Sequence, residues 1–178
     1  MTMLAMPWIA TGSFVYQSFI SSSKEWGTYV IAQSFMAYSI LSVITLFISG
    51  FLIDKFSSRK LLIYMNIPLF FGTIVLYYFD APLSSFVFFG LLGVTNGLAN
   101  VLGSSTWAEI YGVRYIGSIK ALTTALMVFS TAFGTAIFGY LIDIVLTING
   151  ISIISALYIT ISLILLLLIR SSIEPVNT

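Results

Sequence analysis

Apolar residues gather into six long runs along the chain, and short polar breaks separate them. A helix needs about 20 mostly apolar residues to cross a hydrocarbon core of roughly 30 Å. Lipid-exposed backbone must also satisfy its own hydrogen bonds, and the period-two alternation of a barrel strand is missing. The pattern therefore predicts an all-α membrane protein with six transmembrane helices, over residues 3–20, 29–53, 61–79, 83–102, 117–141 and 148–169.

Composition agrees with a lipid environment and excludes several classes of function. Hydrophobic residues make up 59% of the 178 positions and charged residues only 7%, against about 25% charged in a soluble domain. Cysteine and histidine are absent, which leaves no thiolate or imidazole for a metal site or a nucleophile and base pair. We therefore expect no enzyme activity, catalytic residue, metal or cofactor. The net charge of +1 without a basic block gives no reason to expect a nucleic-acid partner.

The basic residues are distributed unequally between the two sides of the predicted membrane segments. Only Lys24 falls on one side, and six fall on the other: Lys55, Arg59, Lys60, Arg114, Lys120 and Arg170. Because cytoplasmic loops carry the excess of Lys and Arg, the side with six is predicted to be cytoplasmic. Both chain termini are then expected on the cytoplasmic side.

A five-residue segment occurs twice, at the ends of the second and fifth apolar runs. The first copy runs from Gly50 to Asp54 and the second from Gly139 to Asp143, an offset of 89 residues, and the copies differ only at Phe51 and Tyr140. This similarity predicts two three-helix repeats, residues 1–80 and 81–178, inserted in opposite senses within one bundle of residues 1–178. Chance similarity is the alternative, because Leu and Ile are frequent in this composition.

The segment from Gly50 to Lys60 resembles the signature of the major facilitator superfamily. Gly50 is followed four residues later by Asp54, then by Lys55, an aromatic residue and the basic pair Arg59 and Lys60. The segment departs from the pattern at Lys55, where Arg is usual, at Ser57, where Gly is usual, and at Ser58, where a basic residue is common. Such weakened copies are typical of the C-terminal half in that family.

A second segment extends the resemblance. Trp107 to Gly112, then Gly117 and the stretch from Phe133 to Asp143, are similar to the loop between helices ten and eleven, and to helix eleven, of prokaryotic members. The resemblance implies a secondary transporter of the inner membrane that moves a small-molecule solute by alternating access. It also implies a second six-helix half as a partner within the lipid bilayer.

Polar residues inside the apolar runs are candidates for contact with a solute, since they are costly in lipid. Asn96 and Asn100 lie one turn apart on the fourth run, and Gln17, with Tyr16 beside it, lies on the first. Amide groups both donate and accept hydrogen bonds, and hydrogen bonding between helices is the alternative role. A hydroxyl stripe on the second run is open to the same two readings; it contains Ser34, Tyr38, Ser42, Thr45 and Ser49.

Charged residues are absent from the middle of every predicted run, so this half shows no proton-relay carboxylate and no buried cation for an anionic solute. We expect Asp54, Lys55, Arg59 and Lys60 to form a closure contact at the cytoplasmic face, with Gly50 allowing close helix packing. Gly139 and Asp143 are expected to do the same at the outer face. A homo-oligomeric channel or a small membrane scaffold remains the alternative function.

Overall fold

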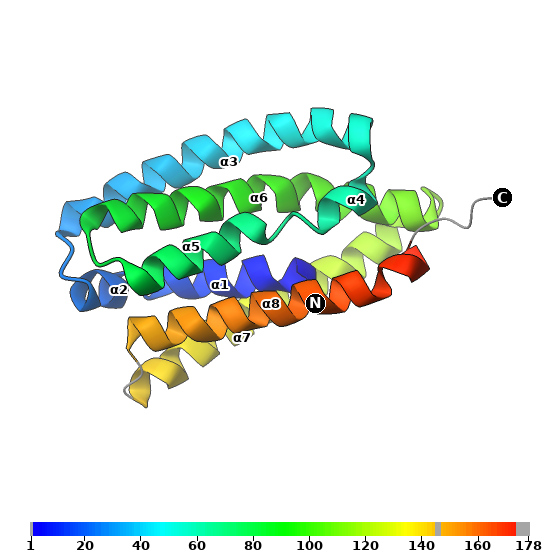
Figure 1. Ribbon diagram of the computed structural model, residues 1–178. Coiled ribbons are helices and arrows are strands. Elements are labelled where there is room, and N and C mark those ends of the chain that lie inside the picture. Colours follow the sequence, from blue (N-terminus) through cyan, green and yellow to red (C-terminus); the bar gives the residue numbers. More distant parts are fainter. Residues whose placement is uncertain (1, 145–146, 174–178) are drawn as a thin grey trace.

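The computed structural model describes residues 2–144 and 147–173, except for the side chains of residues 28 and 169–173. The described chain is helical, with short connections and without strands. Its helices are α1 (Thr2–Val15), α2 (Gln17–Ser23), α3 (Thr28–Phe56), α4 (Ser58–Leu62), α5 (Ile67–Tyr78), α6 (Pro82–Tyr111), α7 (Ile116–Asp143) and α8 (Ile148–Ile173). They lie roughly side by side in a long bundle (Figure 1).

Five helical segments of the described chain are long and apolar enough to cross a membrane. These segments are Tyr29–Phe56, Ser58–Tyr78, Pro82–Tyr111, Ile116–Asp143 and Ile148–Leu168. Each overlaps one of the apolar runs found in the sequence, and the chain is accordingly an integral membrane protein. The first run forms the shorter helix α1, followed after Tyr16 by α2.

Two of the apolar runs are interrupted, which the hydrophobic pattern does not predict. The third run is divided into α4 and α5 by residues 63–66. Pro68, in the first turn of α5, explains the break, because its ring lacks an N–H and is incompatible with a continuous preceding helix. Asn66 is fully buried at this break, and its Nδ2 donates to the Thr2 carbonyl oxygen at 2.7 Å. This hydrogen bond joins the broken helix to the start of α1.

The fourth run extends further than predicted. α6 continues to Tyr111, so residues 107–111, expected in a loop from the family resemblance, form its last turn. Gly112 ends the helix with a φ of +73°, a conformation that glycine adopts without steric cost. The correction matters because it places Glu109 on a helix beside the start of α4.

The helices pack in a few extensive pairs. α6 packs against α3 and against α5, α1 packs against α7 and α8, and α5 also packs against α8. The main core lies between these helices and contains large buried side chains such as Phe88, Phe89 and Ile9. In Figure 1 the long helices run between the same two ends of the bundle.

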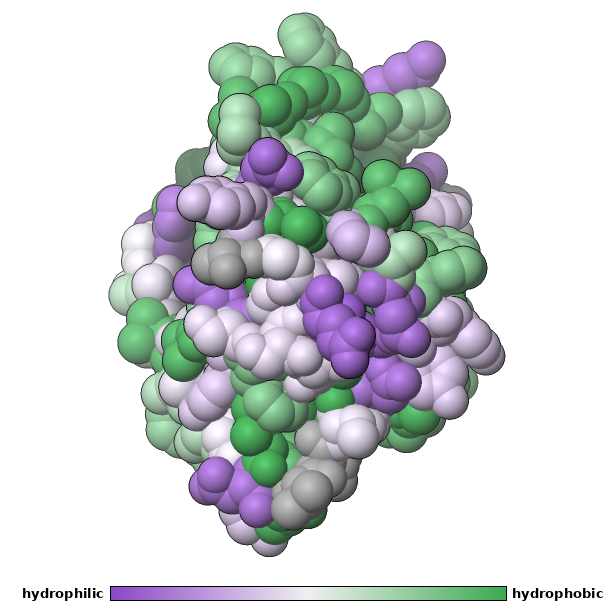
Figure 2. All heavy atoms as spheres, turned by 90° about the vertical axis from the view of Figure 1, so that its left-hand side faces the viewer, coloured by the Kyte–Doolittle hydropathy of each residue, from purple (hydrophilic) through white to green (hydrophobic). Residues whose placement is uncertain are grey.

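The two ends differ in charge. The end that contains residues 54–60 and 109–120 is called the basic end here, because it contains Lys55, Arg59, Lys60, Arg114 and Lys120. The opposite end contains residues 24–27, 79–82 and 147–149 and is called the Lys24 end after its single basic residue. The side chain of Arg170, the sixth basic residue in the sequence-based count, lies outside the described part of the structure. Figure 2 views the Lys24 end, where hydrophilic side chains gather near the centre and apolar ones predominate toward the upper edge.

Candidate functional site

The predicted amide pair lies on α6, and one member of it reaches across to α3. Asn96 Nδ2 donates to Ser42 Oγ at 2.8 Å. Asn100 Nδ2 donates to the Asn96 carbonyl oxygen at 2.9 Å and contacts Asn96 Oδ1 at 3.3 Å. Asn96 is half-buried, whereas Asn100 is exposed on the surface of α6. Asn96 therefore joins α6 to α3. The Asn100 side chain is on the exposed face of α6, where it can contact a ligand or another chain.

Glycines allow α6 to approach α3 this closely. A Cβ at Gly93 would collide with the Tyr38 carbonyl oxygen, and one at Gly97 would lie 2.6 Å from the Ser42 carbonyl oxygen. Small residues at such crossings let two backbones come into contact within a membrane. The hydrogen bond from Asn96 to Ser42 forms at the same crossing.

The hydroxyl stripe of α3 belongs to this crossing. Ser34 and Ser49 are fully buried, and Ser34 Oγ forms a 2.8 Å hydrogen bond with Ser85 Oγ on α6. Ser42, the partner of Asn96, is also buried. Of the two readings of this stripe, the structure therefore favours helix packing.

Gln17 and Tyr16 lie at the junction of α1 and α2 and point to different neighbours. Gln17 is half-buried and lines a pocket between α2 and α3 together with Ser21, Trp26 and Phe35. Neither Asn96 nor Asn100 lines that pocket. The Tyr16 ring stacks on Phe138 of α7, with centroids 6.3 Å apart. The structure thus does not bring Gln17 and Asn100 into one pocket.

Tyr16 instead gives Gly139 a local role. A Cβ at Gly139 would lie 2.5 Å from Tyr16 Oη, so the absence of a side chain makes room for the phenol. Among the residues that the structure describes, none has an atom within 4 Å of a Cβ built at Gly50. The two glycines of the repeated segment therefore have different surroundings in this chain.

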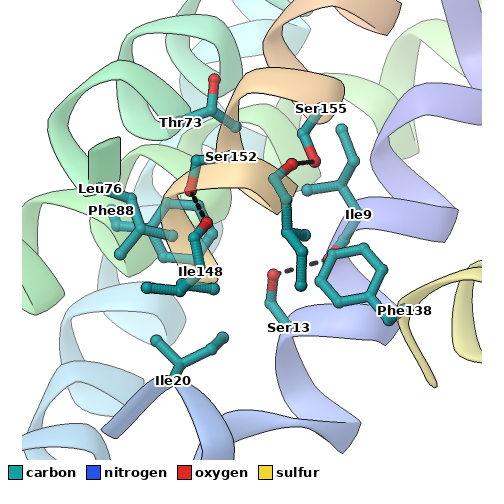
Figure 3. A pocket seen from close by; sticks show the side chains of 11 residues that line it. Ile9, Ser13, Ile20, Thr73, Leu76, Phe88, Phe138, Ile148, Ser152 and Ser155 are labelled. Atoms are coloured by element: carbon teal, nitrogen blue, oxygen red, sulfur yellow. Dashed lines mark hydrogen bonds between the residues drawn. The ribbon is translucent and has the colours of Figure 1, made fainter. Parts of the chain in front are cut away.

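A small cavity lies between α1 and the helices packed around it (Figure 3). Hydroxyls of Ser13, Thr73, Ser152 and Ser155 are among its lining groups. Each donates to a carbonyl of its own helix at 2.8 to 2.9 Å. The volume is about 10 Å³, which is room for roughly one water molecule. An organic solute does not fit, so this cavity is not the solute site.

At the basic end, Glu109 joins α6 to the turn between α3 and α4. Ser57 Oγ donates to Glu109 Oε1 at 2.5 Å, and the Ser58 backbone N–H donates to Oε2 at 2.9 Å. Ser58 Oγ also donates to Oε2, and Arg59 Nε lies 3.3 Å from Oε1. Arg59 donates in addition to the Glu109 carbonyl oxygen. We call this set of contacts the Glu109 clamp.

The residues expected to form the cytoplasmic closure contact are only partly in this clamp. Arg59 takes part, but its acidic partner is Glu109. Asp54, Lys55 and Lys60 are exposed, and Lys55 lies over the Phe56 ring at 5.3 Å. At the other end of the bundle, Asp143 is the last residue of α7 and is exposed.

At the Lys24 end, two connections and the start of α8 meet at one buried ammonium group. Lys24 Nζ lies 2.5 Å from Asp80 Oδ1 and 2.9 Å from Asn149 Oδ1. Trp26 Nε1 donates to the Asp80 carbonyl oxygen at 2.6 Å. The Lys24 side chain is 1% exposed and that of Asp80 is 75% exposed. We call this set the Lys24 clasp.

Sequence reasoning missed the partners in both the clamp and the clasp. The available signal was the presence of opposite charges at the same end of the predicted bundle: Arg59 with Glu109, and Lys24 with Asp80. That signal does not select one partner among several, because the choice depends on how each helix is rotated. The described residues contain no group of three or more His, Cys, Asp or Glu that could hold a metal ion.

The chemistry offered by the predicted site residues is that of neutral hydrogen bonding. Amides and hydroxyls can bind hydroxyl, amide or carboxylate groups of a solute. Comparison with protein families, curated proteins and solved structures gives no match to this chain.

Proposed function

We propose that this chain is one six-helix half of a secondary transporter that moves a small solute by alternating access, as in the major facilitator superfamily. In this proposal α1 and α2 act as one span. With Tyr16 between them they extend over roughly 33 Å at 1.5 Å per residue. The helical hydrogen bonds across Tyr16 are retained, from Tyr16 N–H to the Gly12 carbonyl oxygen and from Ile20 N–H to the Tyr16 carbonyl oxygen, both at 3.0 Å.

The observation that carries the proposal is a repeated helix crossing. A Cβ at Gly97 of α6 would lie 2.8 Å from Thr45 Cβ of α3, and one at Gly134 of α7 would lie 2.7 Å from Trp8 Cα of α1. Trp8 and Gly97 are 89 positions apart, and so are Thr45 and Gly134. This is the offset of the repeated segments at Gly50 and Gly139. Both crossings therefore join the same two positions of the repeat. In one crossing the glycine is at the position of Trp8 and Gly97, and in the other it is at the position of Thr45 and Gly134.

The remaining helix pairs support the same exchange. In the repeat, α1 with α2 corresponds to α6, α3 corresponds to α7, and α4 with α5 corresponds to α8. When corresponding segments are interchanged, the pair α3 and α6 becomes the pair α7 and α1. The pair α5 and α6 likewise becomes α8 and α1, and the pair α5 and α8 becomes itself; all of these pairs are packed. Inverted repeats of this kind are characteristic of transporters that work by rocking about a central site.

A second six-helix half is part of the proposal. Of the five long apolar segments, α3 and α7 are the least buried. In the most apolar 18-residue stretch of each, 11% is buried, compared with 44% in α6. They are also the two helices that the repeat relates to each other. A partner bundle beside them would enclose a cavity between the halves, with the basic end at the cytoplasmic side as the positive-inside rule requires.

The solute site in this proposal includes Asn100, with Gln17 as a further candidate. The preferred solute is polar, and its binding does not need a buried charged side chain in this half. Asn100 is exposed on α6, where a cavity between two halves would reach it. A homo-oligomeric channel would use the same exposed amide, but it would be open to both sides at once.

Cysteine labelling of Asn100 tests alternating access, because the chain has no native cysteine. The complete two-half protein carrying Asn100→Cys is reconstituted in proteoliposomes and treated with a membrane-impermeant thiol reagent from either side. Ser13→Cys, a buried position, is the matched control. We expect labelling of Asn100→Cys from both sides, no labelling of the control, and no leak of a small trapped dye. Access from one side only would reject the proposal, and access from both sides with dye leak would favour the channel.

A further inference from the structure

A groove opens at the basic end, where α3 ends and α4 begins. Its volume is about 360 Å³, and its lining comes from the last turns of α3, from α4 and from the break that follows it. The lining residues are Leu52, Phe56, Lys60, Leu61, Ile63 and Tyr64. The break caused by Pro68 thus contributes one wall of the groove.

The lining is apolar apart from one ammonium group and one phenol. Phe56 and Tyr64 are large side chains, yet 47% and 60% of their surfaces are exposed. Free phosphate or another small anion gains nothing from these side chains. A hydrocarbon chain, in contrast, matches them, because burying apolar surface is favourable.

The rim of the groove is positively charged. Lys60 lines it, and the Lys55 ammonium lies 5.3 Å from the centre of the Phe56 ring. Neither lysine forms a salt bridge within the described part of the chain, whereas the neighbouring Arg59 is paired with Glu109. Asp54 lies two residues before Phe56, about 200° away around α3, so its carboxylate is on a different face.

We propose that this groove binds one anionic glycerophospholipid. The acyl chain lies along Phe56, Ile63 and Tyr64, and the phosphate is held by Lys60 with help from Lys55. The groove lies at the end of the membrane-spanning part of α3, the depth at which lipid headgroups meet basic side chains. This inference goes beyond the proposed function and does not depend on transport.

Native mass spectrometry of the full chain in mild detergent tests the site. Phosphatidylglycerol and phosphatidylcholine with identical acyl chains are compared as ligands. We expect phosphatidylglycerol to bind about fivefold more tightly for each lysine that contacts its phosphate. Lys60→Ala should lower this preference about fivefold, and Lys60→Arg should retain it. Equal binding of the two lipids by the unchanged protein would overturn the proposal.

Two controls separate a lipid site from general attraction between charges. Lys120→Ala removes the same charge at the basic end, but on α7 and outside the groove lining, so it should leave the preference unchanged. Glycerol phosphate, the headgroup chemistry without acyl chains, should not displace the lipid at millimolar concentration. A loss at Lys120→Ala equal to that at Lys60→Ala, or full displacement by glycerol phosphate, would show a nonspecific anion effect and reject the groove.

Discussion

Ser57 connects α3 to α4 in a backbone conformation that favours glycine. Its φ is +72° and its ψ is 139°, and a side chain at positive φ costs about 1–2 kcal/mol. The family pattern that this segment resembles has glycine at the same position. The serine is compatible with the turn because its hydroxyl donates to Glu109, a contact that glycine would lose.

The variants Ser57→Gly and Ser57→Ala separate the strain from the hydrogen bond. Both remove the hydroxyl, but only glycine also relieves the backbone. We therefore expect Ser57→Gly to be more stable than Ser57→Ala by about 1–2 kcal/mol. The unchanged protein should be no more stable than the glycine variant. Thermal unfolding in detergent measures the order. An alanine variant as stable as the glycine variant would show that the turn is unstrained.

The Lys24 clasp predicts unequal effects from its two charged members. Removing the acidic partner leaves a buried ammonium without its counter-ion, whereas removing the lysine leaves an exposed carboxylate that water can solvate. Breaking a buried pair from one side costs about 3–5 kcal/mol. We expect Asp80→Asn to approach the lower part of that range and Lys24→Met to cost clearly less. Equal losses of stability would contradict the burial of Lys24 in the clasp.

Among the elements, the crossing of α3 and α6 depends most on the absence of side chains. Gly97 and Gly103 lie on the same helix, but of these two only Gly97 faces the α3 backbone. No atom of the described residues lies within 4 Å of a Cβ at Gly103. The repeated crossing at Trp8 and Gly134 is equally tight. α6 therefore presents two glycines, Gly93 and Gly97, to the backbone of α3, and α7 presents Gly134 to the backbone of α1.

Alanine substitutions on α6 test this crossing with an internal control. Gly97→Ala forces the helices apart and should destabilise the bundle by about 1–3 kcal/mol, the usual cost of overpacking. Gly103→Ala should be neutral or stabilise by up to about 1 kcal/mol, because alanine is the better helix former. Unfolding in detergent measures both. If the two variants are equally stable, α3 and α6 do not pack through Gly97.

For the whole molecule, the charge difference between the two ends predicts the orientation in the membrane. The basic end contains five of the six basic residues whose side chains are described, and the Lys24 end contains one. Lys55 and Ala81 are exposed at opposite ends, which makes them suitable for labelling. Ser58 belongs to the same turn as Lys55 but is fully buried, so it is a poor position for a reagent.

Single-cysteine variants determine the orientation directly. Ala81→Cys should react in intact cells with a membrane-impermeant reagent, and Lys55→Cys should react only after the membrane is opened. In intact cells we therefore expect labelling of Ala81→Cys to exceed that of Lys55→Cys clearly. Preferential labelling of Lys55→Cys in intact cells would place the basic end outside and reverse the topology.

The hydrophobic pattern was sufficient to predict helices at all six apolar runs, and the structure confirms five of them as long apolar helices. These helices could be predicted because the length of an apolar run and the need to satisfy backbone hydrogen bonds are local properties of the chain. The pairing of Asn96 with Asn100 was equally local, since residues four apart share one face of a helix. The break at residues 63–66 also had a local signal in Pro68, which the hydrophobicity of the surrounding run obscured.

Only the tertiary structure decided which side chains meet across helices. Asn96 reaches Ser42, and Arg59 pairs with Glu109 while Asp54 stays exposed. Gly139 faces Tyr16, whereas no described residue lies within 4 Å of a Cβ at Gly50. Each of these outcomes depends on the rotation and tilt of two helices about their own axes. Those angles are set by the summed packing of many side chains, which no single segment of the sequence contains.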